Sequence, residues 1–215
     1  VVSLLPKRDF IGVEDVAHLC AGGETPFLKR NADALLRFSL DKSRGMPGRA
    51  EHYRVYAEAK GRLGELLHVE AGDIAFLGSA SDGVNLAALA TDWRAGDNVV
   101  VEDIEYPSVV YPWEAARAKG VEVRVVPTHG GDDDGAALAA VVDGRTRMVA
   151  VSQVSYLTGL RHDLEQMRAL ADSVGARLLV DESHGLGVVP VRADLGDLLV
   201  SCCDSRVLWA HGIGM

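Results

Sequence analysis

The stretch that most constrains the fold is Ala176–Pro190, which reads ARLLVDESHGLGVVP. Its first five residues are mostly apolar and lie between a helix-like segment and a glycine-rich turn, which is typical of a buried strand in a parallel sheet. The strand ends in Asp181, and open α/β sheets bind their ligands at the carboxyl ends of their strands. A carboxylate in apolar surroundings is costly without a partner, so the stretch predicts a cation opposite Asp181.

A second candidate side chain lies in the turn that follows this strand. His184 comes three residues after Asp181, and Gly185 and Gly187 follow it. Glycine lets the backbone bend away from the sheet without a side-chain clash. We therefore expect Asp181 and His184 to lie at the same edge of the sheet.

Strand and helix patterns alternate along most of the chain. Apolar runs predict strands at 73–77, 97–103, 121–127, 146–155, 176–182 and 197–203. Helical patterns lie between them at 78–93, 108–120, 134–144 and 161–175, and Gly175 is the expected stop of the last. This order is typical of βαβ units, so we predict an α/β fold, a mostly parallel sheet with helices on both faces.

The beginning of the chain has a weaker pattern. We expect a helix over 31–40, a break at 44–48, and a long charged surface helix from Pro47 to Leu67. The predicted organisation is an N-terminal segment, 1–44, followed by the main domain, 45–215.

Composition narrows the class of protein. The 215 residues are 48% hydrophobic, enough for one sizeable core, and the net charge of −9 argues against general nucleic-acid binding. No apolar run has the length of a membrane span and none opens the chain as a signal peptide would.

The three cysteines, Cys20, Cys202 and Cys203, form neither a disulfide framework nor a zinc spacing, so we expect a reducing, cytoplasmic setting. We expect Cys202 and Cys203 to be core residues of a strand. The aspartates of 130–135 lack the spacing of a calcium loop, so no metal site is predicted.

The segment 77–85, LGSASDGVN, follows a predicted strand and opens a helix. Ser79, Ala80 and Ser81 place small side chains and free amides at the helix N-terminus, a geometry that binds phosphate. The alternative is an ordinary capped helix, because serine and aspartate are favoured there in any case. Neither GxGxxG nor GxxxxGK[ST] occurs in the chain.

An aromatic residue follows the strand at 97–103. Tyr106 lies in the segment 101–113, VEDIEYPSVVYPW, where its ring could stack on a planar ligand. The alternative is a tyrosine that covers the edge of the sheet.

Taken together and in order, these segments resemble the pyridoxal-phosphate enzymes of fold type I. LGSASDGVN is similar to the pattern TSGATEAIN, IEYPSVVYPW to EHHxNxxPW, VSQVSYLTG to SHVSNxxG, and LLVDESHGLGVVPV to LLVDGAHxxGxxPV. The chain from about residue 45 is thereby identified as a member of the class V aminotransferase and cysteine desulfurase-like group, which includes isopenicillin-N-epimerase-like proteins. The resemblance implies the large domain of such an enzyme, an amino-acid substrate, a homodimer, and transamination, epimerisation or elimination chemistry.

The resemblance also implies roles for the candidate residues. Asp181 would hold the proton on the pyridine nitrogen of pyridoxal 5′-phosphate, and His184 would approach the ring oxygen. Tyr106 would stack on the ring, in the place of a family histidine. The phosphate would be held by Ser79, Ala80 and Ser81. Tyr156 stands where the family often has asparagine.

The chain departs from the family at the Schiff-base lysine. In the segment DLLVSCCDSRVLWAHGIG, Ser205 stands at the lysine position and Asp204 where a phosphate-contacting residue is usual, and the chain has no lysine after Lys119. Arg206 is no substitute because a guanidinium stays protonated. We therefore expect no covalent attachment of the cofactor. Three explanations stay open: an altered segment 204–209, a non-catalytic relative that binds a phosphate ligand or acts structurally, or a lysine from another chain.

Two further expectations complete the sequence-based picture. Family members continue into a further part of the large domain and a C-terminal domain, so the resemblance implies that the catalytic site is incomplete within these residues. A distant alternative is a serine hydrolase that uses Ser81, although Ser79 stands where GxSxG requires glycine.

Overall fold

A computed structural model describes residues 5–128, 135–203 and 212–215. The described chain forms two compact units: residues up to 75 with Cys203, and residues 76–202 with 212–215. The predicted boundary between the N-terminal segment, 1–44, and the main domain, 45–215, stays a prediction. Ser205, Asp204 and Arg206 lie outside the described residues, as does the loop 130–134.

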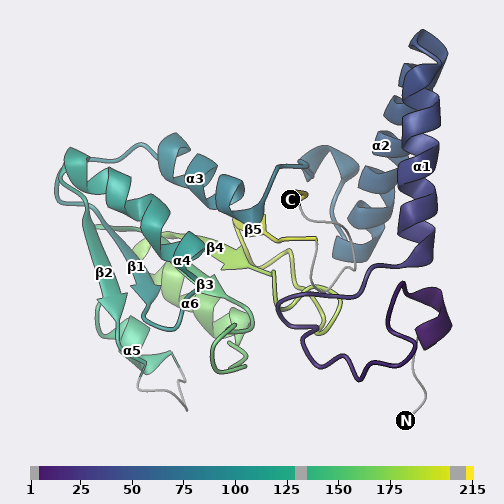
Figure 1. Cartoon of the computed structure of the whole chain (residues 1–215). Helices are drawn as coiled ribbons and strands as arrows, with labels where there is room; N and C mark the ends of the chain where they lie inside the picture. Colours follow the sequence, from purple (N-terminus) through teal and green to yellow (C-terminus); the bar gives the residue numbers. More distant parts are fainter. Residues whose placement is uncertain (1–4, 129–134, 204–211) are drawn as a thin grey trace. The chain divides into compact units, whose positions relative to one another are not determined.

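The larger unit is built on a five-stranded parallel sheet with the order β2-β1-β3-β4-β5 (Figure 1). The strands are β1 (Asn98–Glu102), β2 (Glu122–Val126), β3 (Thr146–Ser152), β4 (Arg177–Asp181) and β5 (Leu198–Val200). All neighbouring pairs are parallel, and β3 lies at the centre between β1 and β4. The predicted parallel α/β sheet is therefore confirmed.

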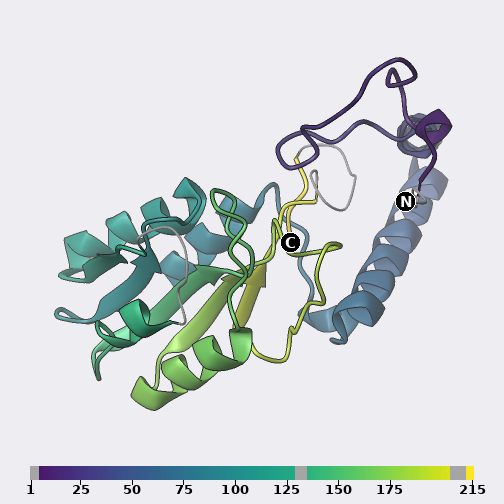
Figure 2. The ribbon, with the colours of Figure 1, turned by 90° about the horizontal axis from the view of Figure 1, so that it is seen from below.

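Helices cover both faces of this sheet (Figure 2). One face packs against α3 (Ala80–Ala90), α4 (Pro107–Val110) and the 3₁₀ helix η3 (Tyr111–Lys119). The other face packs against α5 (Ala136–Ala139) and α6 (Leu164–Val174). Successive residues of a strand point to opposite faces, so the apolar runs of β1, β3 and β4 supply both cores at once.

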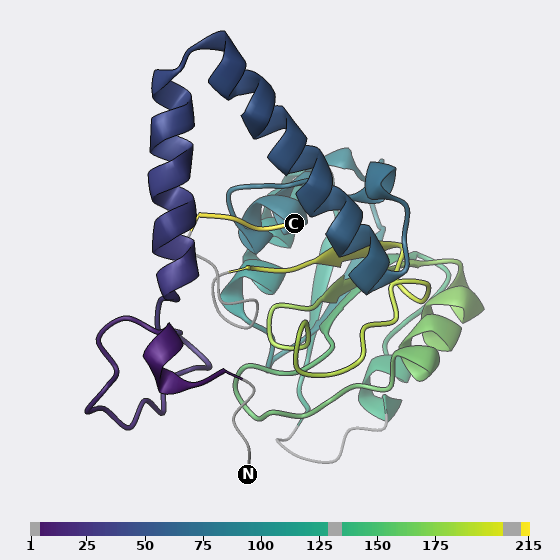
Figure 3. The same cartoon turned by 90° about the vertical axis from the view of Figure 1, so that its right-hand side faces the viewer.

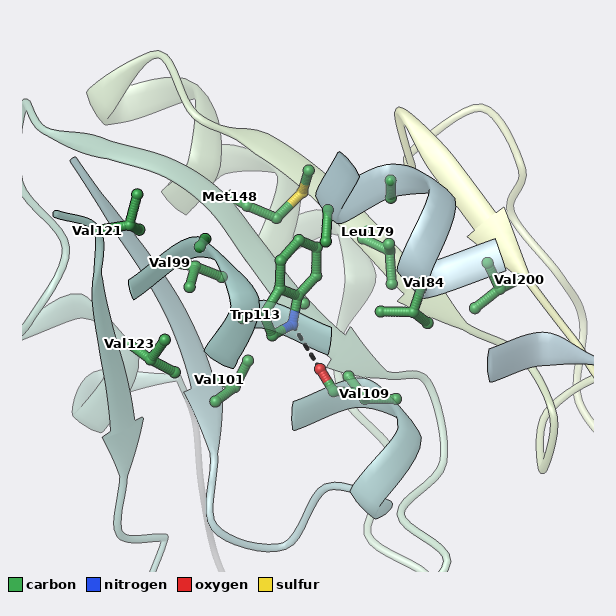
Figure 4. Packing of buried hydrophobic residues seen from close by; sticks show 14 of the residues in the cluster. Val84, Val99, Val101, Val109, Trp113, Val121, Val123, Met148, Leu179 and Val200 are labelled. Carbon is green, nitrogen blue, oxygen red and sulfur yellow. Dashed lines mark hydrogen bonds between the residues drawn. The ribbon is translucent and has the colours of Figure 1, made fainter. Parts of the chain in front are cut away.

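Trp113 is the largest fully buried side chain of the first core (Figure 4). It packs among Val99, Met148 and Leu179 from three neighbouring strands, and its Nε1–H donates to the Val109 carbonyl. This bond gives the indole a polar partner inside an apolar layer.

The smaller unit is helical (Figure 3). Its elements are η1 (Lys7–Asp9), α1 (Lys29–Ser43), α2 (Met46–Leu67) and η2 (Ala71–Asp73). The long helix predicted from Pro47 is confirmed as α2, with Pro47 in its first turn. Helix α1 begins two residues earlier and ends three residues later than the predicted 31–40.

The structure corrects three sequence predictions about elements. No strand forms at 73–77, where η2 occupies the start and Leu77 makes only an isolated bridge to Gly214. The helix expected over 108–120 is a short α-helix followed by a 3₁₀ helix, and Pro112, which has no N–H to donate, lies at their junction.

The third concerns the end of the sheet, because β5 stops at Val200. Cys202 and Cys203 thus lie beyond the strand in which they were expected. Cys203 is buried, whereas Cys202 is partly exposed and pairs through its backbone with Gly214.

Candidate active site

Asp181 ends β4 beside Ser152, the last residue of β3, with which it is in register. The side chain is 4% exposed. The strand predicted from the apolar run therefore places a carboxylate at the carboxyl edge of the sheet, where ligands bind in open α/β folds.

The surroundings of Asp181 are only partly polar. Its Oδ1 accepts the Ser183 N–H at 2.8 Å, and the Ser183 hydroxyl also bonds to the carboxylate. Burial raises the pKa of Asp181, and the Ser183 bonds and the nearby His184 oppose that rise. The carboxylate is thus in a place where a cationic partner would be strongly favoured.

Three rings gather at this edge. The Tyr106 and Tyr156 rings meet edge to face with centroids 5.0 Å apart, and Tyr156 lies 6.5 Å from the His184 ring. Tyr106 and Tyr156 are 48% and 42% exposed. The structure thus joins the predicted residues Tyr106 and His184 through Tyr156, in a half-open aromatic surface beside the strand ends.

The N-terminus of α3 is capped as its sequence suggests. Ser79 is the N-cap residue, and its Oγ accepts the Asp82 N–H at 3.2 Å. Ala80 is buried against the core, and Ser81 lies in the first turn. The serine hydroxyl is therefore occupied by the helix, and a ligand here would bind through backbone N–H groups.

The segment 212–215 links the loop before α3 to the turn after β4. Gly214 exchanges two backbone hydrogen bonds with Leu77, at 2.8 and 2.9 Å, and Met215 exchanges two with Ser201. The next residue, Cys202, donates its N–H to the Ser183 Oγ. Hydrogen bonds therefore connect the loop before α3 to the turn that carries Asp181.

Sequence reasoning missed a buried acid beside Asp181. Glu105, directly before Tyr106, accepts the Ser152 N–H at 2.6 Å and the Ser152 hydroxyl at 2.5 Å. Burial raises the pKa of Glu105 to about 7, against the opposing effect of the two Ser152 bonds. The only signal in the sequence was its place in the run VEDIEYP at the end of a strand.

Two more buried groups were missed. Glu102 at the end of β1 lies 2.9 Å from the His162 Nε2. Glu182, next to Asp181, is 1% exposed and stands where the family pattern LLVDGAH has glycine. This departure from the pattern was the signal that could have marked Glu182.

The described ranges also bear on metal ions and membrane spans. There, no group of three or more histidine, cysteine, aspartate or glutamate side chains is placed to hold a metal ion. None of the helices in the same ranges has the length and apolar character to cross a membrane.

Solved structures share this fold. The cysteine desulfurase of Thermococcus onnurineus superposes with a TM-score of 0.87 at 21% identity, covering 100% of this chain and 57% of that one. A C-DES variant with glycine covalently linked to the PLP cofactor gives a TM-score of 0.88 at 20% identity, covering 98% and 58%.

Curated relatives carry a consistent name. A probable cysteine desulfurase of Methanothermobacter thermautotrophicus is 30% identical over 195 residues, 87% of this chain and 49% of the relative. A cysteine desulfurase of Dickeya dadantii is 36% identical over 160 residues, 72% of this chain and 38% of the relative. The chain thus matches at most about half the length of these relatives.

The family comparison covers most of the chain. The model of the family described as aminotransferase class-V matches residues 28–200, which include the sheet, α3, the aromatic surface and Asp181. The chain belongs to the class-V aminotransferase family.

Proposed function

We propose that this chain is the cofactor-binding domain of a pyridoxal-phosphate-dependent enzyme that transforms an amino acid. The observation that carries the proposal is the buried Asp181 carboxylate at the end of β4. Family membership, and relatives named as cysteine desulfurases, agree with it.

The residues present fit this cofactor. Burial disfavours the charged form of Asp181, and a protonated pyridine nitrogen would supply the positive partner that reverses this cost. The N-terminus of α3 offers backbone N–H groups for a phosphate, and Tyr106 offers a ring face for stacking. When bound, pyridoxal phosphate would supply an electron sink for bond breaking at the α-carbon of the substrate.

Each proposed residue has a distinct task. Asp181 would hold a proton on the ring nitrogen, and His184 would approach the ring oxygen. Tyr106 would stack on the ring and limit its movement, but a phenol is a poor proton shuttle near neutral pH. Ser79, Ala80 and Ser81 would hold the phosphate through their backbone. Tyr106 stands where the family has a histidine. The proposed mechanism therefore gives this position no role in acid–base catalysis.

The residue at the family's lysine position decides how the cofactor would be held. With Ser205 at the family's lysine position and no lysine after Lys119, the chain's own residues would hold the cofactor without a covalent bond. We propose a small amino-acid substrate, and the names of the relatives favour cleavage of a carbon–sulfur bond over transamination or epimerisation. The homodimer and the cytoplasmic location expected from the sequence are part of the same proposal.

The test is an absorbance spectrum of the chain mixed with pyridoxal phosphate, followed by borohydride treatment and intact-mass measurement. We expect saturable binding and no mass fixed by reduction. A mass gain fixed on a lysine would contradict the non-covalent part of the proposal.

Absence of binding would contradict the cofactor-binding proposal itself and favour a structural relative. Labelling by a serine-directed phosphonate that is lost in Ser81→Ala would instead support the hydrolase alternative. The Asp181→Asn variant is the matched control, because it keeps the side-chain volume while removing the charge.

A further inference from the structure

Glu182 and Gln153 carry buried oxygen atoms that the proposed mechanism does not use. The two side chains are 1% and 2% exposed. In the described part of the chain, neither carboxylate oxygen of Glu182 nor the Oε1 of Gln153 has a hydrogen-bond partner. Buried polar atoms are almost always paired, so these three oxygens call for an explanation.

The two side chains converge on one point. A Cβ atom added at Gly185 would lie 2.3 Å from the Glu182 Oε2 and 2.6 Å from the Gln153 Oε1. The Gln153 Nε2 donates to the Pro190 carbonyl at 3.2 Å, which directs its Oε1 to the opposite side. Two acceptors that share one small space repel each other unless a hydrogen atom lies between them, and a protonated carboxyl group would supply it.

We propose that Glu182 is protonated and donates its hydroxyl hydrogen to the Gln153 Oε1, which makes Glu182 a positioning residue for the turn that carries Asp181 and His184. The effect of this pair on the cofactor rests on the proposed function. The protonation itself does not depend on that function.

The backbone shows what this bond would hold together. The Gln153 N–H donates to the Asp181 carbonyl, and the Glu182 N–H donates to the Val200 carbonyl. The Glu182 carbonyl accepts the N–H groups of Gly185 and Leu186. The side-chain bond would therefore close the turn 181–186 against the end of β3, directly beside Asp181.

The electrostatic surroundings agree with a neutral Glu182. Burial raises the pKa of Glu182 to about 8, the Asp181 charge adds to the rise, and Arg161 opposes it. Arg161 comes from the segment between β3 and α6, and Asp181 in turn interacts with Glu105 after β1. Loss of the proton would place a second negative charge beside Asp181 and two acceptors face to face, so the turn would open.

The direct test is a carbon-13 NMR titration of the full chain labelled at the glutamate carboxyl carbons. We expect a carboxyl signal that titrates far above the ordinary glutamate value of about 4.3 and is missing in Glu182→Gln. The same signal should persist in Glu105→Gln, which separates it from the other buried acid. A Glu182 signal that titrates at the ordinary value would overturn the proposal, as would a signal that shifts on addition of potassium, because a cation would then occupy the space.

A second measurement follows unfolding by urea as a function of pH. Because the pKa is raised in the folded chain, wild-type stability should fall as pH increases from about 4.5 towards 8. Glu182→Gln should lose this part of the pH dependence, since its amide can donate to the Gln153 Oε1 at every pH. The exposed Glu65→Gln is the matched control and should keep the wild-type profile. An unchanged profile in Glu182→Gln would contradict the inference.

The positioning role is tested with pyridoxal phosphate. One pH unit above the titration point about a tenth of the chain keeps the proton, so the apparent affinity should fall about tenfold there. Glu182→Gln should not show this fall, and the comparison cancels the cofactor's own titration. Equal pH profiles would overturn the positioning role. If the cofactor fails to bind at any pH, the proposed function fails, and the NMR titration still decides whether Glu182 is protonated.

Discussion

The Nε2 atom of His162 lies 2.9 Å from a carboxylate oxygen of Glu102, and both side chains are fully buried. The other ring nitrogen, Nδ1, lies 2.8 Å from the Ser152 carbonyl, which can only accept a hydrogen bond. The imidazole therefore joins the end of β1 to the end of β3. Burial alone would lower the pKa of His162, but the bond and the charge of Glu102 outweigh it, so the pKa is raised.

This pair leads to a prediction about pH and stability. A raised pKa in the folded chain means that the contribution of His162 is complete below its ordinary value of about 6.5 and is lost as pH rises through the folded value. His162→Gln removes the His162 side of the buried ion pair with Glu102. Breaking a buried ion pair by removing one member costs about 3–5 kcal/mol, so we expect a loss of that size at pH 6. Urea unfolding at several pH values would measure it. The exposed His18→Gln should have no such effect, and a double variant with Glu102→Gln should recover part of the loss.

Asp181→Asn is expected to affect binding and stability in opposite directions. A hydrogen bond to a charged group contributes about 1.5–3 kcal/mol, so pyridoxal phosphate affinity should fall roughly ten- to hundredfold. The cofactor-free chain should be at least as stable at pH 7, because burial raises the pKa of Asp181 and ionisation there is unfavourable. Fluorescence titration and thermal unfolding give the two readouts. Equal affinity of the variant and the wild type would contradict the role of Asp181.

The two capped helices offer a matched pair of substitutions. Ser79 caps α3 at the proposed phosphate site, and Asp163 caps α6, accepting the N–H groups of Glu165 and Gln166. Replacing either cap by alanine should cost about 0.5–2 kcal/mol of stability. Only Ser79→Ala should also weaken pyridoxal phosphate binding, because it loosens the first turn of α3. A similar loss of affinity in Asp163→Ala would show that binding follows stability alone.

Gly214→Ala tests the backbone link between the loop before α3 and the residues after β5. A Cβ at this position would lie 2.3 Å from the backbone carbon of Ser79 and 2.6 Å from the Ala80 nitrogen. Backbone atoms have no rotamer that relieves such a clash, so we expect the Leu77–Gly214 pair to separate and the chain to lose stability. Gly144→Ala meets no atom within 4 Å and serves as the control. Amide hydrogen exchange at Leu77 and Gly214 would show faster exchange in the first variant only.

The strands were predictable wherever a short apolar run was buried on both faces. The runs of β1, β3 and β4 are of this kind, and Gly175 marked the C-terminal end of α6. The run at 73–77 has the same apolar character, but its backbone pairs with the distant Gly214, and no local pattern reveals such a partner. The local sequence thus predicted the strands whose apolar residues are buried on both faces. It failed at 73–77, where the backbone partner lies far away in the sequence.

The position of single residues at the sheet edge could be predicted from the sequence, but the contacts between side chains of different strands could not. Asp181 is the last residue of β4, and Tyr106 lies in the short segment between the end of β1 and α4, so their place at the sheet edge follows from the parallel arrangement. The contacts of Glu105 with Ser152, and of Glu102 with His162, depend on β1 and β3 being neighbours. That neighbourhood is a property of the strand order, which the alternation of strands and helices leaves open.

The space at Gly185 has a consequence for the evolution of this turn. The oxygens of Glu182 and Gln153 fill the position that a side chain at 185 would need. The pattern LLVDGAHxxGxxPV, which this stretch resembles, has glycine at position 182 and leaves position 185 free, whereas this chain has glutamate at 182 and glycine at 185. Substitutions at 182 and 185 should therefore covary among homologues, and a lineage that acquires the glutamate can keep it only with glycine three residues later.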